Sequence, residues 1–231
     1  MNDRPGNQKR NPAPEPVGGA KSPFTAEGVL DYERRRYRSF DQRWIHARET
    51  RLVIRHFREA GWEEGRSLSI LDLPCGYGRF SPLLLHLGAR LLNSDLSLEM
   101  VRRAMGKSGR PGVVADATVG LPFRAGAIDA VFSMRLFHHI HDPARRRAIL
   151  GEFARVSAGF AVVSYYRSNV LHKAQRALRR LRRKTSRRIS MIDAATFRSE
   201  AESAGWTVDR DIPLLRGLHA ARITLLTKSG R

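Results

Sequence analysis

One stretch constrains this chain more than any other: a short strand, a tight glycine loop and a helix follow one another directly. An apolar run at 68–73 leads into a loop at 74–79 that contains Gly76 and Gly78, and apolar residues then recur at helical spacing over 80–87. Because glycine has no Cβ, such a loop can adopt positive φ and let its backbone approach a ligand closely. The first N–H groups of the helix face the same place. In open α/β sheets ligands bind at the carboxyl ends of the strands, so we expect this loop to form the floor of a cofactor site.

A second strand ends in an acid at the spacing used for ribose recognition. Residues 89–95 are expected to form a second strand that ends at Asp95, which follows the glycine loop by roughly the 20 residues typical of nucleotide-binding folds. A carboxylate can accept both hydroxyl hydrogens of a ribose diol. This spacing suits S-adenosylmethionine and NAD alike, since both carry an adenosine ribose. The alternative is a local role in which Asp95 caps the helix that begins near Ser97.

The glycine loop resembles a known motif. The run Asp72-Leu73-Pro74-Cys75-Gly76-Tyr77-Gly78 is similar to motif I of the class I S-adenosylmethionine-dependent methyltransferases, Asp-x-Gly-x-Gly-x-Gly, with Pro74 in place of the first glycine. A dinucleotide fingerprint would need a third glycine or alanine where Ser81 stands.

A second resemblance to this family begins at Asp116-Ala117 and continues with Leu-Pro-Phe at 121–123. In the family's third motif the acid binds the adenine amine and the next backbone N–H reaches a ring nitrogen. This feature favours the methyl donor over NAD, because NAD-type dehydrogenases hold adenine mostly in an apolar slot. A purely turn-forming Asp116 is the alternative.

The region after the fourth expected strand, 127–134, also resembles this family. In the family the loop after strand 4 borders the transferred methyl group and often carries a histidine pair, which here is His138 and His139. A neutral imidazole can accept a proton from an attacking hydroxyl near pH 7. The resemblance therefore implies a catalytic role for one of the two histidines, and the sequence does not say which.

Taken residue by residue, the resemblance implies a cofactor site and an acceptor site. The residues expected to bind S-adenosyl-L-methionine are Asp72, Pro74, Cys75, Gly76, Gly78, Asp95, Leu96, Asp116, Ala117 and Met134. The residues expected to contact the acceptor are Tyr37, Arg135, Tyr165 and Tyr166. The two tyrosines end the fifth strand, where alternation should turn one of them into a helix layer. No metal is expected, because a single cysteine, Cys75, rules out a cysteine-rich cluster.

The motifs run in family order over 68–226 and imply an α/β fold. We expect a Rossmann-like class I methyltransferase fold with a seven-stranded, mostly parallel sheet, helices on both faces and an antiparallel last strand. Three parts of the chain are expected: a disordered arm rich in proline and glycine at 1–28, an N-terminal helical cap at 29–66 and the methyltransferase domain at 67–231. A basic helical insertion is expected at 167–190.

The formal net charge of +20 predicts attraction to something anionic. The segment 167–188 holds ten basic residues and no acid, with an apolar line at helical spacing, which predicts a basic amphipathic helix. Such a helix suits an anionic membrane surface or an anionic substrate, and a solvated helix packed on the domain is the alternative. Without a secretory signal or a long apolar run, we expect a cytoplasmic protein with peripheral contact at the inner face of the membrane.

These features predict methyl transfer from S-adenosylmethionine to a small-molecule, lipid or saccharide acceptor that is anionic or membrane-associated. The Asn-Pro-Pro-Tyr loop of adenine and glutamine methyltransferases is absent at 133–136, which argues against those two substrates. Methylation of cytosine at C5 needs a nucleophilic cysteine outside the glycine loop, and the single cysteine, Cys75, lies within that loop. Three alternatives stay open: an RNA or other nucleic-acid methyltransferase, an NAD-dependent oxidoreductase, and a non-catalytic module that binds the cofactor and recruits partners.

Overall fold

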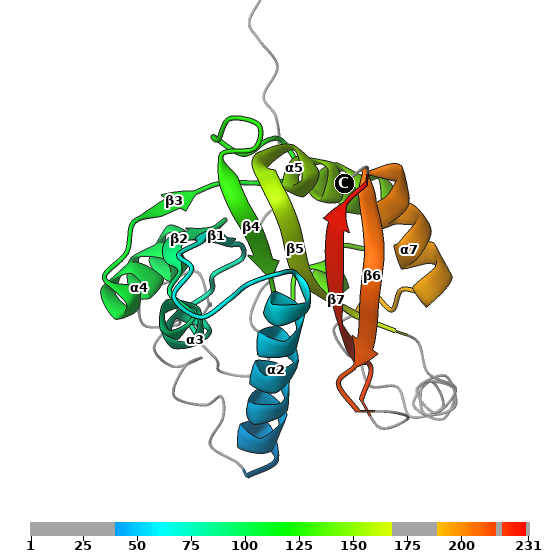
Figure 1. The fold of residues 1–231 in the computed structure, drawn as a ribbon. Coiled ribbons are helices and arrows are strands. Elements are labelled where there is room, and N and C mark those ends of the chain that lie inside the picture. Colours follow the sequence, from blue (N-terminus) through cyan, green and yellow to red (C-terminus); the bar gives the residue numbers. More distant parts are fainter. Residues whose placement is uncertain (1–39, 168–188, 216–218, 230–231) are drawn as a thin grey trace, which may run out of the picture.

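A computed structural model describes residues 40–167, 189–215 and 219–229. Its centre is a seven-stranded sheet with the order β3-β2-β1-β4-β5-β7-β6 (Figure 1). The strands are β1 (Ser69–Asp72), β2 (Arg90–Asp95), β3 (Gly112–Val114), β4 (Ile128–Ser133), β5 (Ser157–Tyr166), β6 (Trp206–Pro213) and β7 (Ala221–Lys228). The predicted seven-stranded α/β fold is confirmed.

The strand order reverses at β1. This strand pairs in parallel with β2 on one side and with β4 on the other, with Leu71 opposite Leu92 and Val131. A crevice at the carboxyl ends of β1 and β4 is where an open α/β sheet holds its ligand. The last strand, β7, is antiparallel to both β5 and β6, as predicted.

Helices cover both faces of the sheet (Figure 1). They are α2 (Phe40–Glu59), α3 (Ser81–His86), α4 (Leu98–Ser108), α5 (Pro143–Val156) and α7 (Ala194–Ser203), with a short 3-10 helix η1 (Phe137–His139). Polar side chains cap three of these helices: the side chain of Ser97 accepts from the N–H of Met100 at the start of α4, and Asp142 and Asp193 cap α5 and α7.

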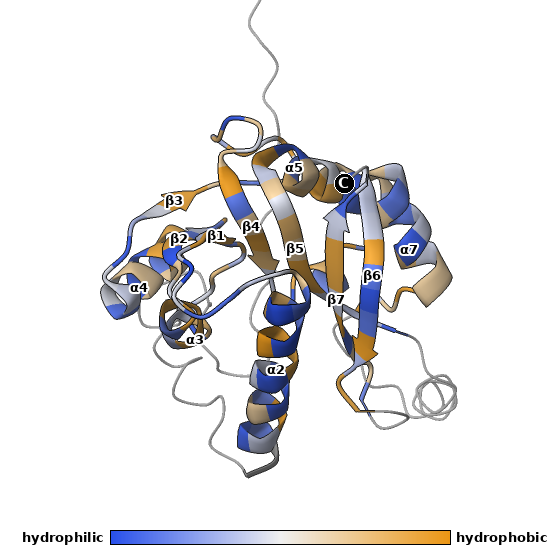
Figure 2. Cartoon of the chain, viewed as in Figure 1, coloured by the Kyte–Doolittle hydropathy of each residue, from blue (hydrophilic) through white to orange (hydrophobic). Residues whose placement is uncertain are grey.

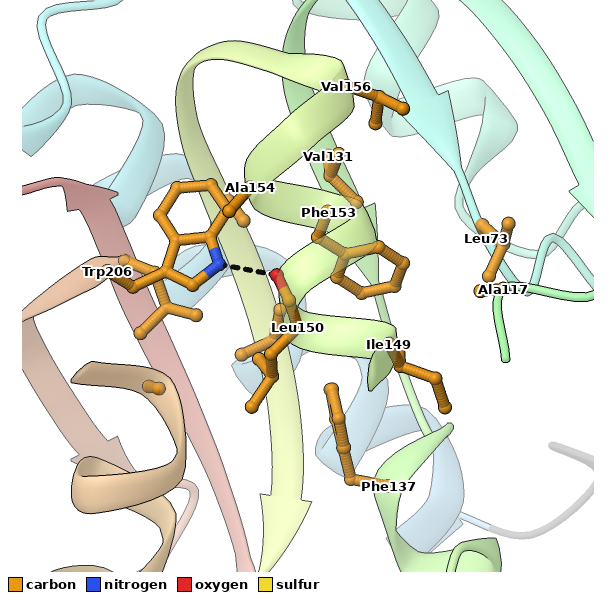
Figure 3. Packing of buried hydrophobic residues seen from close by; sticks show 14 of the residues in the cluster. Leu73, Ala117, Val131, Phe137, Ile149, Leu150, Phe153, Ala154, Val156 and Trp206 are labelled. Carbon is orange, nitrogen blue, oxygen red and sulfur yellow. Dashed lines mark hydrogen bonds between the residues drawn. The ribbon is translucent and has the colours of Figure 1, made fainter. Parts of the chain in front are cut away.

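Two large apolar clusters hold these layers together. On one face α5 and α7 pack on the sheet, and the indole N–H of the fully buried Trp206 donates to the Leu150 carbonyl at 2.9 Å (Figure 3). On the other face Val53 and Phe57 of α2 pack against Phe160 of β5. In Figure 2 the central strands β4, β5 and β7 are largely orange, and α2 alternates between hydrophilic and hydrophobic residues. Helix α2 therefore packs into the same apolar core as the sheet, which fixes its position relative to the strands.

Several predictions fall outside the described residues. These are the N-terminal arm, Tyr37, and the basic helix expected after Arg167. Within the described part, no helix has the length and apolar character needed to cross a membrane.

Candidate functional site

The glycine loop lies where β1 ends. Gly76 has φ +53° and Gly78 has φ +75°, the region that glycine adopts without strain. A Cβ at Gly76 would meet nothing within 4 Å, so the surface above it is open. A Cβ at Gly78 would lie 3.0 Å from the backbone of Ala104, so this glycine lets α4 pack closely. One glycine thus leaves room for a ligand and the other admits a helix.

Asp95, at the end of β2, holds the glycine loop in place. Its Oδ2 accepts the Gly76 N–H at 3.0 Å and its Oδ1 accepts the Ser97 N–H at 3.0 Å. Burial raises the pKa of Asp95, and these backbone hydrogen bonds offset part of the rise. Each carboxylate oxygen can accept a second hydrogen bond. Asp95 can therefore hold the backbone of the glycine loop and also accept hydrogen bonds from a ribose, as predicted.

Asp72 lies beneath the loop and is only 2% exposed. Its Oδ2 has no hydrogen-bond partner within the described ranges. Burial, and then the charge of Asp95, raise the pKa of Asp72 well above its ordinary value. A buried carboxylate without a partner, next to a second carboxylate, favours a cationic ligand. S-adenosylmethionine carries an ammonium and a sulfonium group, so the donor set fits this cofactor.

Pro74 and Cys75 contribute to the loop differently. The Leu73–Pro74 peptide is cis. The Cys75 side chain is buried against Val101 and Ala104, and its N–H donates to the Ser94 carbonyl at 2.8 Å. Burial raises the pKa of the thiol far above its usual value, so Cys75 stays protonated and is not poised as a nucleophile.

The loop after β3 comes close to Asp95. The Ala115 N–H donates to the Asp95 carbonyl at 3.2 Å. Asp116 accepts from both the N–H and the hydroxyl of Thr118, at 2.8 and 2.7 Å, so it does form a turn. Both bonds use Oδ1, which leaves Oδ2 for the predicted adenine contact. Leu96, directly after β2, is 64% exposed beside this loop.

The loop after β4 is tied to α2 by a buried ion cluster that sequence reasoning missed. Glu49 accepts from Arg135 at 2.9 Å and also from Arg79, which contacts His46. Burial opposes ionisation of Glu49, but Arg135 and Arg79 outweigh it and lower its pKa. Arg135 has φ +64°, and its N–H donates to the Ser164 hydroxyl at 2.8 Å. A glutamate on the apolar face of α2, next to Leu52, was the available signal.

Four rings meet near the end of β5. His138 stacks on Tyr166 with ring centroids 4.5 Å apart and lies 3.9 Å from His139. His219, which precedes β7, meets Tyr166 edge-on at 6.1 Å. Its Nδ1 accepts the Ala221 N–H at 3.0 Å, so a neutral His219 carries its proton on Nε2. His138 is buried and His139 is exposed. His219 was not predicted from the sequence, because no motif surrounds it.

The prediction that Tyr165 contacts the acceptor is wrong. Its side chain is fully buried, stacks on Phe197 at 4.1 Å and donates its hydroxyl to Asp211 at 2.8 Å. Successive residues of a strand face opposite sides, so only Tyr166 turns toward the histidines. Met134 is buried in the core beside Arg135. Within the described ranges, no group of three His, Cys, Asp or Glu side chains could hold a metal ion.

Comparisons with known proteins agree with this geometry. Residues 71–163 match the family model for a methyltransferase domain. The chain is 32% identical over 96 residues to a malonyl-[acyl-carrier protein] O-methyltransferase of Hamiltonella defensa, covering 42% of this chain and 36% of that protein. It is 35% identical over 79 residues to a ubiquinone biosynthesis O-methyltransferase of Xanthomonas axonopodis, covering 32% of this chain and 33% of that one.

A third relative is a tRNA (carboxymethyluridine(34)-5-O)-methyltransferase of Arabidopsis thaliana, 32% identical over 99 residues, which are 42% of this chain and 24% of that protein. These matches span about a third or less of each curated relative. Among solved structures, magnesium protoporphyrin IX methyltransferase from Synechocystis with bound S-adenosylhomocysteine matches with TM-score 0.69 and 21% identity, covering 87% of this chain and 94% of that one. Residues 71–163 therefore match a methyltransferase domain, and the chain shares the fold of a solved methyltransferase that binds an S-adenosyl compound.

Proposed function

We propose that this protein transfers the methyl group of S-adenosylmethionine to a small-molecule, lipid or saccharide acceptor of anionic character. The observation that carries the proposal is the buried Asp72 carboxylate, which lies without a hydrogen-bond partner in the described part of the chain beneath an open glycine loop. Such a carboxylate is costly unless a cation completes the site. The bound cofactor would supply an electrophilic methyl group on a sulfonium centre.

On the cofactor side, the residues bind and orient. Asp72 would face the positive charge, and Asp95 would accept from the ribose while it keeps the Gly76 N–H in place. Asp116 would accept from the adenine amine through Oδ2, next to Ala117 and Leu96. Because the methyl group arrives already activated, most of the rate enhancement would come from holding the nucleophile in line with it in a dry site.

On the acceptor side, the described residues include an exposed histidine, His139, and the stacked rings of His138 and Tyr166. His139 is the exposed member of the histidine pair, so we assign the proton-accepting role to His139 and a packing role to His138. Tyr166 would line the acceptor pocket. The cluster of Arg79, Arg135 and Glu49 holds two cationic groups against one carboxylate, and this excess of positive charge favours an anionic acceptor.

The acceptor class rests on what related proteins are named for. Two curated relatives are O-methyltransferases named for a malonyl group on a carrier protein and for ubiquinone biosynthesis, and a structural neighbour is named for magnesium protoporphyrin IX. A nucleic acid is the second candidate, because one relative is a tRNA methyltransferase and the net charge is +20. Binding to RNA that weakens steeply with salt would favour that candidate.

Calorimetric titration of the purified protein with S-adenosylmethionine, S-adenosylhomocysteine and NAD tests the proposal. We expect micromolar binding of both S-adenosyl compounds and no binding of NAD. Binding of NAD alone would contradict the proposal and favour an oxidoreductase. If none of the three compounds binds, the proposal is contradicted as well, and a non-catalytic interaction module is favoured.

A further inference from the structure

We propose that the carboxyl-edge face of the sheet rests on an anionic membrane and that the methyl acceptor is a lipid of that membrane. The inference rests on the proposed function, whose acceptor class it narrows. It is carried by the exposed side chains of the described residues around the cofactor loop. We call these side chains the rim: Trp44, Leu98, Val114, Val119 and Ile189.

The rim holds five of the seven large apolar side chains that are exposed in the described ranges. Its side chains are between 39% and 85% exposed, and besides them the large exposed apolar side chains in these ranges are Leu96 and Met105. Leu96 lies at the same edge and is expected to contact the cofactor. Scattered exposed apolar residues are ordinary, but a group on one face marks an interaction surface.

The topology puts these residues at one edge. Leu98 begins α4 directly after β2, Val114 ends β3, and Val119 follows in the next loop. Because β1 to β5 run parallel, their carboxyl ends share an edge. Trp44 lies five residues before Glu49 on α2, and Glu49 accepts a hydrogen bond from Arg135 in the loop after β4. Ile189 precedes Ser190, whose N–H donates to the His138 carbonyl at 2.8 Å.

Positive charge lies on the same edge. Arg43 in the first turn of α2, Arg145 in the first turn of α5 and Arg167 after β5 are all exposed. The Arg145 guanidinium reaches the Thr118 hydroxyl at 3.5 Å, which places it beside Val119. Each arginine near an anionic bilayer contributes about 1 kcal/mol of binding. The combination of exposed apolar and basic side chains is typical of proteins that lie on a membrane surface.

The chemistry of the rim favours lipid over nucleic acid. Four of its five side chains are aliphatic, and only Trp44 has a ring that could stack on a base. Binding of single-stranded RNA depends on aromatic platforms. Leucine, valine and isoleucine gain free energy instead by leaving water for hydrocarbon, about 25 cal/mol per Å² of apolar surface. A face with aliphatic side chains around the cofactor loop would bring the lipid headgroup region to the methyl group.

The test is sedimentation of the full chain with vesicles of phosphatidylglycerol and phosphatidylcholine. The rim variant is Leu98→Gln with Val119→Gln, which changes no charge and no residue of the proposed catalytic or cofactor site. Its matched control is Met105→Gln, because Met105 is an exposed apolar residue of the same helix α4, two turns from Leu98 and toward the opposite edge. A charge variant, Arg43→Gln with Arg145→Gln, is matched by Arg58→Gln with Arg110→Gln at the amino edge.

We expect the wild type and both controls to bind anionic vesicles, and the rim and charge variants to bind at least tenfold more weakly. The proposal is overturned if the wild type does not sediment with the vesicles, if the rim variant binds as the wild type does, or if single-stranded RNA competes the protein off. Titration of each variant with S-adenosylmethionine separates the two proposals. Cofactor binding without vesicle binding would reject the membrane face and leave the methyltransferase proposal standing.

Discussion

The carboxylate of Glu49 in α2 accepts a hydrogen bond from Arg135 in the loop after β4 at 2.9 Å, across 86 residues of sequence. Arg79, from the loop after β1, binds the other oxygen of the same carboxylate. The two loops that border the proposed cofactor site are therefore joined to one helix through one buried acid. Because Glu49 is only 2% exposed, its ionised form depends on both arginines.

Glu49→Gln should destabilise the protein by about 3 kcal/mol, because removing one partner leaves buried charge without compensation. Urea denaturation followed by circular dichroism measures the change. Glu99→Gln is the control: its carboxylate pairs with the exposed Arg102 of α4 at 2.9 Å, and such pairs contribute about 1 kcal/mol or less. Equal losses for the two variants would show that the buried cluster does not hold α2 in place.

The contribution of Glu49 should also depend on pH. The pKa of Glu49 is lowered from its ordinary 4.5, so its stabilisation is present above that value and is lost as the pH falls through the folded-state pKa. The difference in unfolding free energy between the wild type and Glu49→Gln should be constant near neutral pH and shrink below about pH 4.5. If this difference in unfolding free energy grows in acid instead, the pKa of Glu49 is raised by folding rather than lowered, and the stabilising role of the ionised carboxylate is rejected.

Gly76→Ala should weaken S-adenosylmethionine binding by more than its effect on stability explains. A Cβ there meets no atom within 4 Å, so the methyl would project into the space assigned to the cofactor. Its positive φ should cost about 1–2 kcal/mol of stability. Gly126→Ala is the control, because Gly126 has φ +65° and equally open surroundings in a loop before β4. Similar melting temperatures with cofactor affinity lost only in Gly76→Ala would support the assignment, and equal affinities would contradict it.

The fold was predictable because its signals are local. Apolar runs, the glycine loop and capping residues such as Asp142 each lie within a few residues of sequence, and together they indicate alternating strands and helices. Strand β6 is harder to bound from its sequence, because it is an edge strand that runs to Pro213 and tolerates polar residues such as Asp209 and Arg210. The irregular register between Val208 and Arg210 also hides the alternation.

The site was predictable only where a motif marks it. The partnership of Glu49 with Arg135 depends on how α2 packs, which the sequence pattern does not determine. His219 meets Tyr166 only because β7 folds back antiparallel to β5. For Tyr165 and Tyr166, alternation predicts opposite faces, but choosing between them needs the register of β5 in the sheet.

Asp95→Ala should weaken S-adenosylmethionine binding about tenfold or more, because it removes a charged acceptor worth roughly 1.5–3 kcal/mol. The variant also frees the Gly76 N–H that Asp95 holds at 3.0 Å. Asp142→Ala removes a comparable bond, to the Ala144 N–H at 2.9 Å, away from the cofactor loop. The control should lose about 1 kcal/mol of stability and keep full affinity by calorimetry. Unchanged affinity in Asp95→Ala would reject its ribose role.

Asp72→Asn should stabilise the protein without cofactor at neutral pH and abolish most cofactor binding. Burial and the neighbouring Asp95 raise the pKa of Asp72, so its contribution to stability is fully present below the ordinary value of 3.8 and is lost as the pH rises through the folded-state pKa. The melting temperature of the variant should exceed that of the wild type at pH 7, and the gap should close in acid. About 1 kcal/mol corresponds to roughly 2–4 °C in a chain of this size.

Asp129→Asn is the opposite case, since hydrogen bonds from Ser69 outweigh burial and lower the pKa of Asp129, so that variant should melt lower than the wild type at pH 7. If Asp72→Asn melts lower at pH 7 and still binds S-adenosylmethionine, then Asp72 is a structural acid and the cation site lies elsewhere.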